Sequence, residues 1–219
     1  MHSVVWLLTP SKVEAAALQK GLRKEEKNSL SLRITGVGAV ATLHTLWGWH
    51  HREEKPIALI AVGLAGSYSK HLMPPMLVSV VQETWGDLGK RRGRFFFPTH
   101  PTLREDFALS LKGACECPLA VPSVRGVTLN TVSGSYKEAR FWRRNYPDAD
   151  IETQENAAYF LFANTHQIPF LSFRVISNKV GDKKWALEEA LQALTEFSEK
   201  YVASLCEWLL ARNTSSHEG

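Results

Sequence analysis

Two side chains with different hydrogen-bonding chemistry flank a helix and a strand in the second half of the chain. Glu155 stands where a helix is expected to begin, and Asn178 follows the apolar run from Phe170 to Ile176. A carboxylate only accepts hydrogen bonds, whereas an amide both donates and accepts them. Open α/β sheets bind ligands where strand ends meet helix starts. The stretch from Asp150 to Val180 therefore predicts a ligand site.

A third carboxylate lies near the N-terminus. Glu14 falls in the first turn of a helix that follows Thr9-Pro10-Ser11 and ends at Gly21. The helix dipole favours a negative charge at that position, so position alone indicates a helix-stabilising role.

A glycine-rich turn follows the strand expected from Leu30 to Thr35. Its pattern Gly36-x-Gly38-x-x-Ala41 has the spacing of a dinucleotide fingerprint. The acidic residue expected about 20 positions later would be Glu53 or Glu54. Both stand in a charged linker rather than at a strand end, so the fingerprint is incomplete and no organic cofactor is predicted.

The elements that must position these residues alternate between strand and helix. Most strands are almost wholly apolar, which is typical of a sheet covered on both faces. We predict an α/β fold with three layers, in which a mixed, largely buried β-sheet is flanked by helices. The expected strands are Ser3 to Leu8, Leu30 to Thr35, Pro56 to Gly63, Met76 to Val81, Arg125 to Val132 and Phe170 to Ile176.

The remaining segments complete one domain over residues 1–219. Gly63 to Ser67 reads as a small-residue turn in which backbone comes close to another group. Residues 90–124 form an elaborated loop region with a helix near Leu103 to Leu111. Helices are expected from Tyr136 to Asn145 and, as a long amphipathic element, from Trp185 to Arg212. Residues 213–219 are expected to form a frayed tail.

Composition narrows the classes of protein. The chain has 219 residues, 44% of them hydrophobic and 22% charged, which is ordinary for a globular domain. No apolar run approaches the roughly 20 residues that span a bilayer, and the N-terminus lacks a secretory pattern. We therefore expect a cytoplasmic protein without a membrane partner. Cys115, Cys117 and Cys206 predict neither a disulfide framework nor a metal site.

The net charge of +4 raises the question of nucleic acid. The densest basic run contains Lys90, Arg91, Arg92 and Arg94, and Phe95 to Phe97 follow it. Basic residues interleaved with aromatics can bind single strands. A solvated loop or an oligomer contact explains the same pattern, and we favour that interpretation, so no nucleic-acid partner is predicted.

Seven short motifs follow one another along nearly the whole chain. They are TPSKVE, GVGAVAT, AVGLAGS, QETWGDLG, TVSGS, ETQENAAYF and RVISN. In this order they resemble the purine nucleoside phosphorylase and nucleosidase superfamily. Within it the chain looks most like the futalosine hydrolases, and more distantly like the methylthioadenosine/adenosylhomocysteine nucleosidases. The resemblance implies a nucleoside phosphorylase-like fold, a homo-oligomer, and no metal or organic cofactor.

The resemblance also implies a reaction. It is hydrolysis of the N-glycosidic bond of a 6-oxopurine nucleoside, with futalosine losing hypoxanthine in menaquinone biosynthesis. Glu155 matches the carboxylate that grips the ribose hydroxyls, and Glu14 matches the one that orients or activates water. Asn178 matches the residue that bonds the purine at N7, where adenine-specific relatives carry Asp. An amide can donate to a 6-oxo group, so Asn178 indicates a hypoxanthine or guanine nucleoside.

Further substrate contacts are assigned to Gln154, Ala65, Gly66, Val132 and Trp85. Phosphorolysis is disfavoured, because Lys12 stands where the phosphorylase branch carries an arginine-containing anion loop. Two alternatives stay open: an adenine-type nucleosidase acting on methylthioadenosine, and a non-catalytic protein that binds a nucleoside or nucleic acid.

Three positions depart from the family pattern. Gln154 replaces a usual Met, Asn156 a usual Gly, and Leu64 a Ser found in several relatives. Because Asn is larger than Gly, Asn156 is expected to add bulk close to the ligand.

Overall fold

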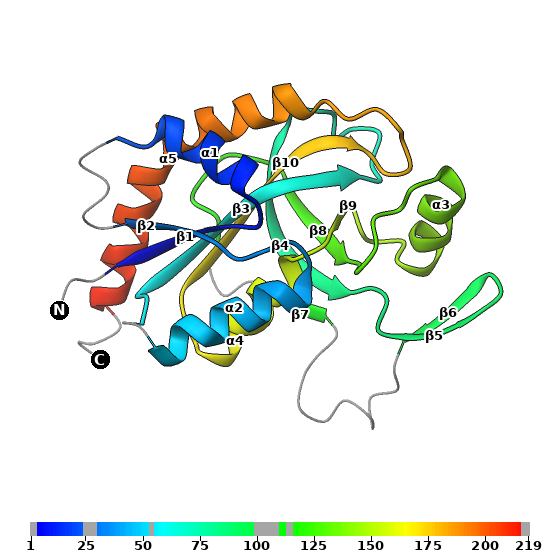
Figure 1. Cartoon of the computed structure of the whole chain (residues 1–219), viewed down its shortest axis with the longest axis horizontal. Coiled ribbons are helices and arrows are strands. Elements are labelled where there is room, and N and C mark those ends of the chain that lie inside the picture. The colour runs from blue at the N-terminus through cyan, green and yellow to red at the C-terminus, as the bar shows by residue number, and fades with distance from the viewer. Residues whose placement is uncertain (1–3, 24–29, 53–54, 99–109, 113–115, 216–219) are drawn as a thin grey trace.

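The computed structural model describes residues 4–23, 30–52, 55–98, 110–112 and 116–215. An eight-stranded mixed sheet runs through it in the order β10-β4-β8-β9-β3-β1-β2, with β7 added beside β4. Helices α1 and α5 lie along one side of the sheet, and α2 and α4 lie along the other (Figure 1). The predicted fold class, a mixed sheet flanked by helices, is confirmed. The principal elements are β1 (Val5–Thr9), α1 (Lys12–Gly21), β2 (Leu30–Ile34), α2 (Ala39–Arg52), β3 (Ala58–Ser67), β4 (Leu77–Trp85), β7 (Ser110–Lys112), β8 (Ser123–Thr128), α3 (Tyr136–Asn145), β9 (Ile151–Thr153), α4 (Asn156–Thr165), β10 (Phe170–Lys179) and α5 (Leu187–Ser215).

Strand β1 shows why the apolar runs form buried strands. Side chains alternate between the two faces of a strand. Val5 and Leu7 join the cluster that includes Leu18 of α1, whereas Trp6 and Leu8 join the cluster that includes Leu46 of α2. Both faces are thus covered, and polar residues have no place in the middle of the strand.

Strand β3 is the centre of the sheet. It pairs in parallel with β1 and β10, and in antiparallel with β9. Strand β10 also pairs with β4, β4 with β8, and β8 with β9, so five strands close a ring. The prediction of a turn from Gly63 to Ser67 is wrong. Strands β9 and β10 pair with the backbone of these residues, so β3 continues to Ser67.

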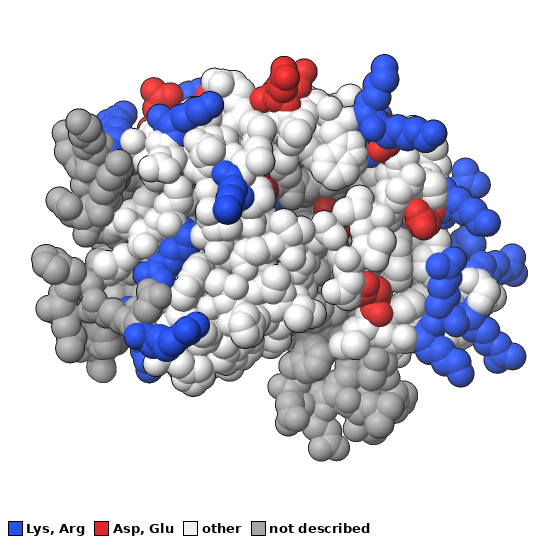
Figure 2. Space-filling view, in the orientation of Figure 1, with Lys and Arg blue, Asp and Glu red and all other residues white. Residues whose placement is uncertain are grey.

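The region expected to be an elaborated loop contains a β-hairpin. Strands β5 (Gly89–Arg92) and β6 (Phe95–Pro98) pair in antiparallel beyond the end of β4. The Phe96 ring packs edge-on against Trp142 of α3, and the Arg91 guanidinium lies 4.3 Å from the Phe141 ring centre. Lys and Arg side chains gather at this end of the molecule (Figure 2).

Two further predictions, a helix in this region and a frayed C-terminal tail, are each wrong in part. The expected helix from Leu103 to Leu111 falls mostly outside the described residues, and its last part is strand in β7. The prediction of a frayed tail over residues 213–219 is wrong for its first three residues, because α5 continues to Ser215. Glu53, Glu54 and Cys115 lie outside the described residues.

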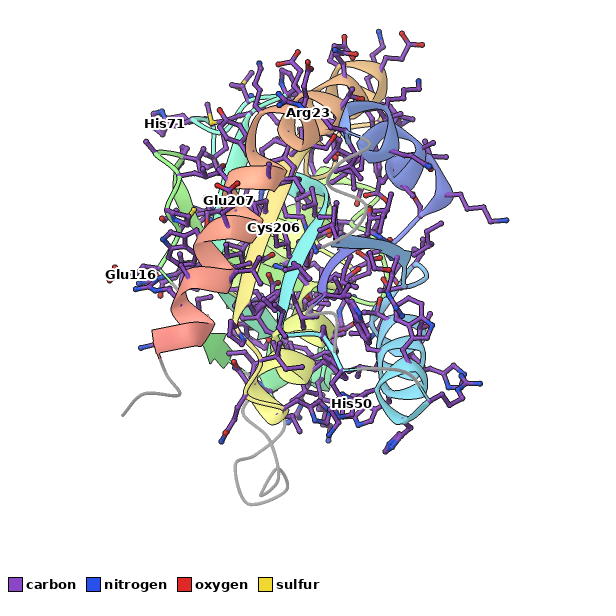
Figure 3. All side chains as sticks on the ribbon, turned by 90° about the vertical axis from the view of Figure 1, so that its left-hand side faces the viewer. Arg23, His50, His71, Glu116, Cys206 and Glu207 are labelled. Carbon is purple, nitrogen blue, oxygen red and sulfur yellow. The ribbon has the colours of Figure 1, made fainter. Side chains whose placement is uncertain are left out.

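Helix α5 runs beside β10 (Figure 3). Cys206 is buried in the cluster on this side of the sheet, and the neighbouring Glu207 is exposed. Within the residues that the structure describes, no helix is both long and apolar enough to cross a membrane.

Candidate functional site

A cavity of about 310 Å³ lies where β3, β9 and β10 end beside the starts of α1 and α4. It collects most of the predicted site residues, namely Glu14, Ala65, Gly66, Val132, Gln154, Glu155 and Asn178. The space-filling view shows acidic atoms inside a hollow in the middle of this face (Figure 2). Small-molecule sites commonly have volumes of about 300 Å³ or more, so a nucleoside-sized ligand is within range.

Trp85 is the predicted site residue that the cavity does not include. It is the last residue of β4, pairs with Thr128 of β8, and packs against the core cluster beneath α4. Residues two apart on a strand share a face, and Trp85 shares its face with the fully buried Glu83.

Glu155 precedes the first residue of α4, as expected, and its side chain is almost fully buried. Its Oε1 accepts a hydrogen bond of 2.8 Å from the Gly38 amide, which stands directly before α2. Burial raises the pKa of Glu155, and the Glu14 charge raises it further, although the Gly38 hydrogen bond and the Arg174 charge lower it. Helix N-termini favour anions, so the glycine-rich turn here holds a carboxylate of the chain itself.

Glu14 caps its own helix and also lines the cavity. It forms a capping box with Ser11, whose backbone amide and hydroxyl both donate to Oε2. Its Oε1 accepts a hydrogen bond of 3.0 Å from the Leu64 amide. A Cβ atom at Gly63 would stand 3.0 Å from this oxygen, so glycine allows the carboxylate to approach the strand. Glu14 is thus both a helix cap and part of the cavity wall.

Asn178 lies inside β10, beside the break in register between Ile176 and Asn178. Its Nδ2 donates to the Lys179 carbonyl at 3.0 Å, and its Oδ1 accepts from the Ser177 hydroxyl at 2.9 Å. A carbonyl can only accept, so this pair of contacts sets which end of the amide is which. One N–H of Nδ2 is used by Lys179, and the other can serve a ligand in the cavity.

Glu152 also faces the cavity and was assigned no role from the sequence. Its carboxylate is buried and accepts hydrogen bonds from the Ser133 amide at 2.8 Å, the Ser133 hydroxyl at 2.7 Å and the Tyr68 hydroxyl. Burial and the neighbouring Glu152 raise the pKa of the Tyr68 phenol, which keeps it a donor. The spacing Glu-x-x-Glu in ETQENAAYF was the available signal.

Asn156 does not add bulk beside a ligand, contrary to expectation. It is fully buried below the cavity, where its Nδ2 donates to Glu83 at 2.6 Å and its Oδ1 accepts from Arg174 and Ser172. Glu83 belongs to the QETWGDLG motif, and burial raises its pKa to about 7. This network holds the start of α4, and therefore the backbone of Glu155, from beneath.

The rim of the cavity is mainly apolar, and several of its members were not predicted as site residues. The added apolar members are Val13, Val37, Leu64, Val180, Trp185, Leu187 and Leu191. In the described part of the chain, no three His, Cys, Asp or Glu side chains lie together as metal ligands would.

The fold and the cavity define an α/β protein with a cavity of small-ligand size between strand ends and helix starts, lined by buried carboxylates and one amide. A family model described as the phosphorylase superfamily matches residues 22–210. The chain therefore belongs to the phosphorylase superfamily.

The individual relatives share less than 30% sequence identity with this chain. A protein named futalosine hydrolase from Streptomyces coelicolor is 28% identical over 158 residues, which cover 68% of this chain and 67% of that protein. A solved structure of the 5′-methylthioadenosine/S-adenosylhomocysteine nucleosidase from Campylobacter jejuni matches with a TM-score of 0.75 and 17% identity, covering 94% of this chain and 99% of the other. A mutant of the Helicobacter pylori enzyme, with 5′-methylthioadenosine in its active site, matches with a TM-score of 0.74, 16% identity and the same coverages.

Proposed function

We propose that this chain is a nucleosidase that hydrolyses the N-glycosidic bond of a 6-oxopurine nucleoside, with futalosine as its substrate. The observation that carries the proposal is that Glu14, Glu155 and Asn178 line one cavity. Family membership and the similarity to a futalosine hydrolase and to methylthioadenosine nucleosidases support cleavage of a nucleoside.

The sugar is assigned to the two glutamates. Oε1 of Glu155 accepts a hydrogen bond from the Gly38 amide. A carboxylate offers about four acceptor sites, so lone pairs remain for the ribose hydroxyls. Oε1 of Glu14 similarly accepts from Leu64 and keeps a lone pair for water. A carboxylate within reach of water acts as a general base, and negative charge beside the sugar stabilises an oxocarbenium-like transition state.

The base is assigned to Asn178. As the glycosidic bond breaks, electrons move into the purine, and a hydrogen bond to N7 stabilises the leaving group. The second N–H of Nδ2 can donate to N7 or to a 6-oxo group, but an amino group at that position is itself a donor. This favours a 6-oxopurine over the adenine nucleosides named for the structural relatives.

Water rather than phosphate is proposed as the nucleophile. Lys12 is exposed and does not line the cavity. The described cavity wall contains carboxylates and no Arg or Lys, and an incoming phosphate would meet charge of its own sign.

One assay tests the proposal. Purified protein is incubated with futalosine, inosine and methylthioadenosine, with and without inorganic phosphate, and free base is measured. We expect hypoxanthine release from futalosine at a rate that phosphate does not change. Release of adenine alone would instead support a methylthioadenosine nucleosidase, and no release from any substrate would support a nucleoside-binding protein.

A further inference from the structure

A second cavity, of about 340 Å³, adjoins the first where β3 and β10 end beside α3. The two cavities share Val180 as a lining residue. Lys179 of β10 is in register with Ser67, the last residue of β3, and both line the second cavity. Tyr68, Ser69 and Lys70 follow β3 directly and complete this side of the wall. The second cavity is therefore bounded by the ends of two strands and by one helix.

Helix α3 contributes the opposite wall and is held against the strand ends. Arg140 and Arg143 both line the cavity, because residues three positions apart lie on one face of a helix. Nη1 of Arg143 donates to the Ala149 carbonyl at 2.9 Å, and the carbonyl of the next residue, Asp150, accepts from the Tyr68 amide at 2.8 Å. These contacts hold the Arg143 side chain beside the residues that follow β3.

The described wall of this cavity carries four cations and no carboxylate. The cations are Lys70, Arg140, Arg143 and Lys179. None of the four forms an ion pair with another residue that the structure describes. Two carboxylates close to them in sequence have other partners, since Glu138 accepts from the Ser135 hydroxyl and Asp182 from the Tyr136 hydroxyl. Positive charges that gather without a counter-charge create a potential that attracts anions.

The side chains of this wall fit one class of anion. The planar guanidinium of Arg matches two oxygens of a phosphate, and the ammonium group of Lys adds a point charge. We propose that the second cavity is a binding site for small multivalent anions of the phosphate class, and we take pyrophosphate as the probe. The inference does not depend on the proposed function, because the carboxylates assigned to the reaction line the other cavity.

A small anion fits this cavity better than a nucleic-acid strand. Its volume is in the range of small-molecule sites. Single-stranded nucleic acid binds along a groove in which successive bases stack on aromatic side chains. The described wall offers two aromatic rings, Tyr68 and Tyr136, and both of their hydroxyls are bonded to carboxylates of the chain.

Calorimetric titration with pyrophosphate tests the proposal. Ionic strength is kept constant, because salt screens exposed charges. The wild type should show one saturable site, and Arg140→Gln and Lys70→Gln should each bind about fivefold more weakly or worse, since each loses a charge-assisted hydrogen bond. The matched control is Arg144→Gln. Arg144 is exposed like Arg140 and lies on the same helix, but it does not line the cavity, so its variant should stay within about twofold of the wild type.

Equal losses in Arg140→Gln and Arg144→Gln would show that pyrophosphate follows the net charge of the surface, and would overturn the inference. A wild type without saturable binding would do the same. A single-stranded oligonucleotide is the second probe. If the oligonucleotide binds in a manner that depends on Arg140 while pyrophosphate does not bind, the cations serve nucleic acid and the inference is wrong. Pyrophosphate should bind whether or not any nucleoside is cleaved, so failure of the proposed function is detected separately.

Discussion

The two ends of the cavity hold their polar groups by different means. At the end that we propose for the sugar, the carboxylates of Glu14 and Glu155 are anchored mainly by backbone amides, those of Leu64, Ser11 and Gly38, with the Ser11 hydroxyl in addition. At the end that we propose for the base, the Ser133, Tyr68 and Ser177 hydroxyls hold Glu152 and Asn178. The Ser133 amide and the Lys179 carbonyl add one backbone contact to each. A backbone donor stays when a side chain is exchanged, whereas a hydroxyl does not. We therefore expect Glu14 and Glu155 to keep their positions better than Glu152 and Asn178 when a neighbouring side chain is exchanged.

The largest effect should come from removing Glu155, the proposed contact to the sugar. Glu155→Ala is expected to lower kcat/KM for the nucleoside by about 10²–10³-fold, because a group that stabilises developing charge is lost. The free base lacks a ribose, so hypoxanthine affinity should stay within about twofold of the wild type. The comparison between the two ends would fail if this variant lost turnover and base binding together.

A smaller effect should follow from displacing the Gly38 amide, which donates to Glu155. Gly38 has φ +90° and open space where a Cβ atom would stand, so Gly38→Ala strains the backbone without a clash. The displaced amide should weaken the hydrogen bond to Glu155 and raise KM for the nucleoside about tenfold.

The matched control is Gly93→Ala. Gly93 has φ +59° and equally open space at the Cβ position, and it lies in the hairpin away from the cavity. It should lower the melting temperature but leave KM unchanged. Equal KM values for both variants would argue against an anchoring role for the Gly38 amide.

The smallest effect concerns stability rather than rate. The pKa of Glu83 is about 7 in the folded protein against an ordinary 4.5, so the native state holds this proton more tightly than the unfolded state. Its contribution to stability is present below pH 4.5 and is lost as the pH rises to about 7, by at most about 1.4 kcal/mol per pH unit.

Glu83→Gln should flatten this dependence, as measured by urea unfolding at a series of pH values. Glu207→Gln should keep the slope of the wild type. A slope that persists in Glu83→Gln would assign the dependence to other groups.

The parts of the fold that could be predicted are those specified by local patterns. Long apolar runs such as Phe170 to Ile176 identified buried strands, and Tyr136 to Asn145 forms the predicted helix. Strand β9 has only three residues, and it exists because β3 and β8 supply partners far away in sequence. The same long-range pairing extends β3 through small residues that resemble a turn.

The site residues also divide into those that local motifs predict and those that depend on the folded structure. Glu14, Glu155 and Asn178 could be placed from motifs, and all three line the cavity. The directions of Trp85 and Asn156 could not, because a strand or helix residue changes face with a small change of register. Asn156 looked like an obstacle in the sequence, yet it bonds Glu83 and Arg174 below the site.

The loop after Asn178 has one further consequence, for how a ligand enters and leaves. Gly181 has φ +90°, and a Cβ there would stand 2.8 Å from the backbone of Ser135 and Tyr136, while the Tyr136 hydroxyl bonds Asp182. The loop beyond β10 is thus pressed onto the start of α3, just after Ser133. We expect the loop beyond β10 and the start of α3 to move together. A ligand would then enter and leave past the apolar rim near Val37 and Leu191. Hydrogen exchange should then show the segments around Ser135 and Gly181 gaining protection jointly when hypoxanthine binds, and independent protection would contradict this coupling.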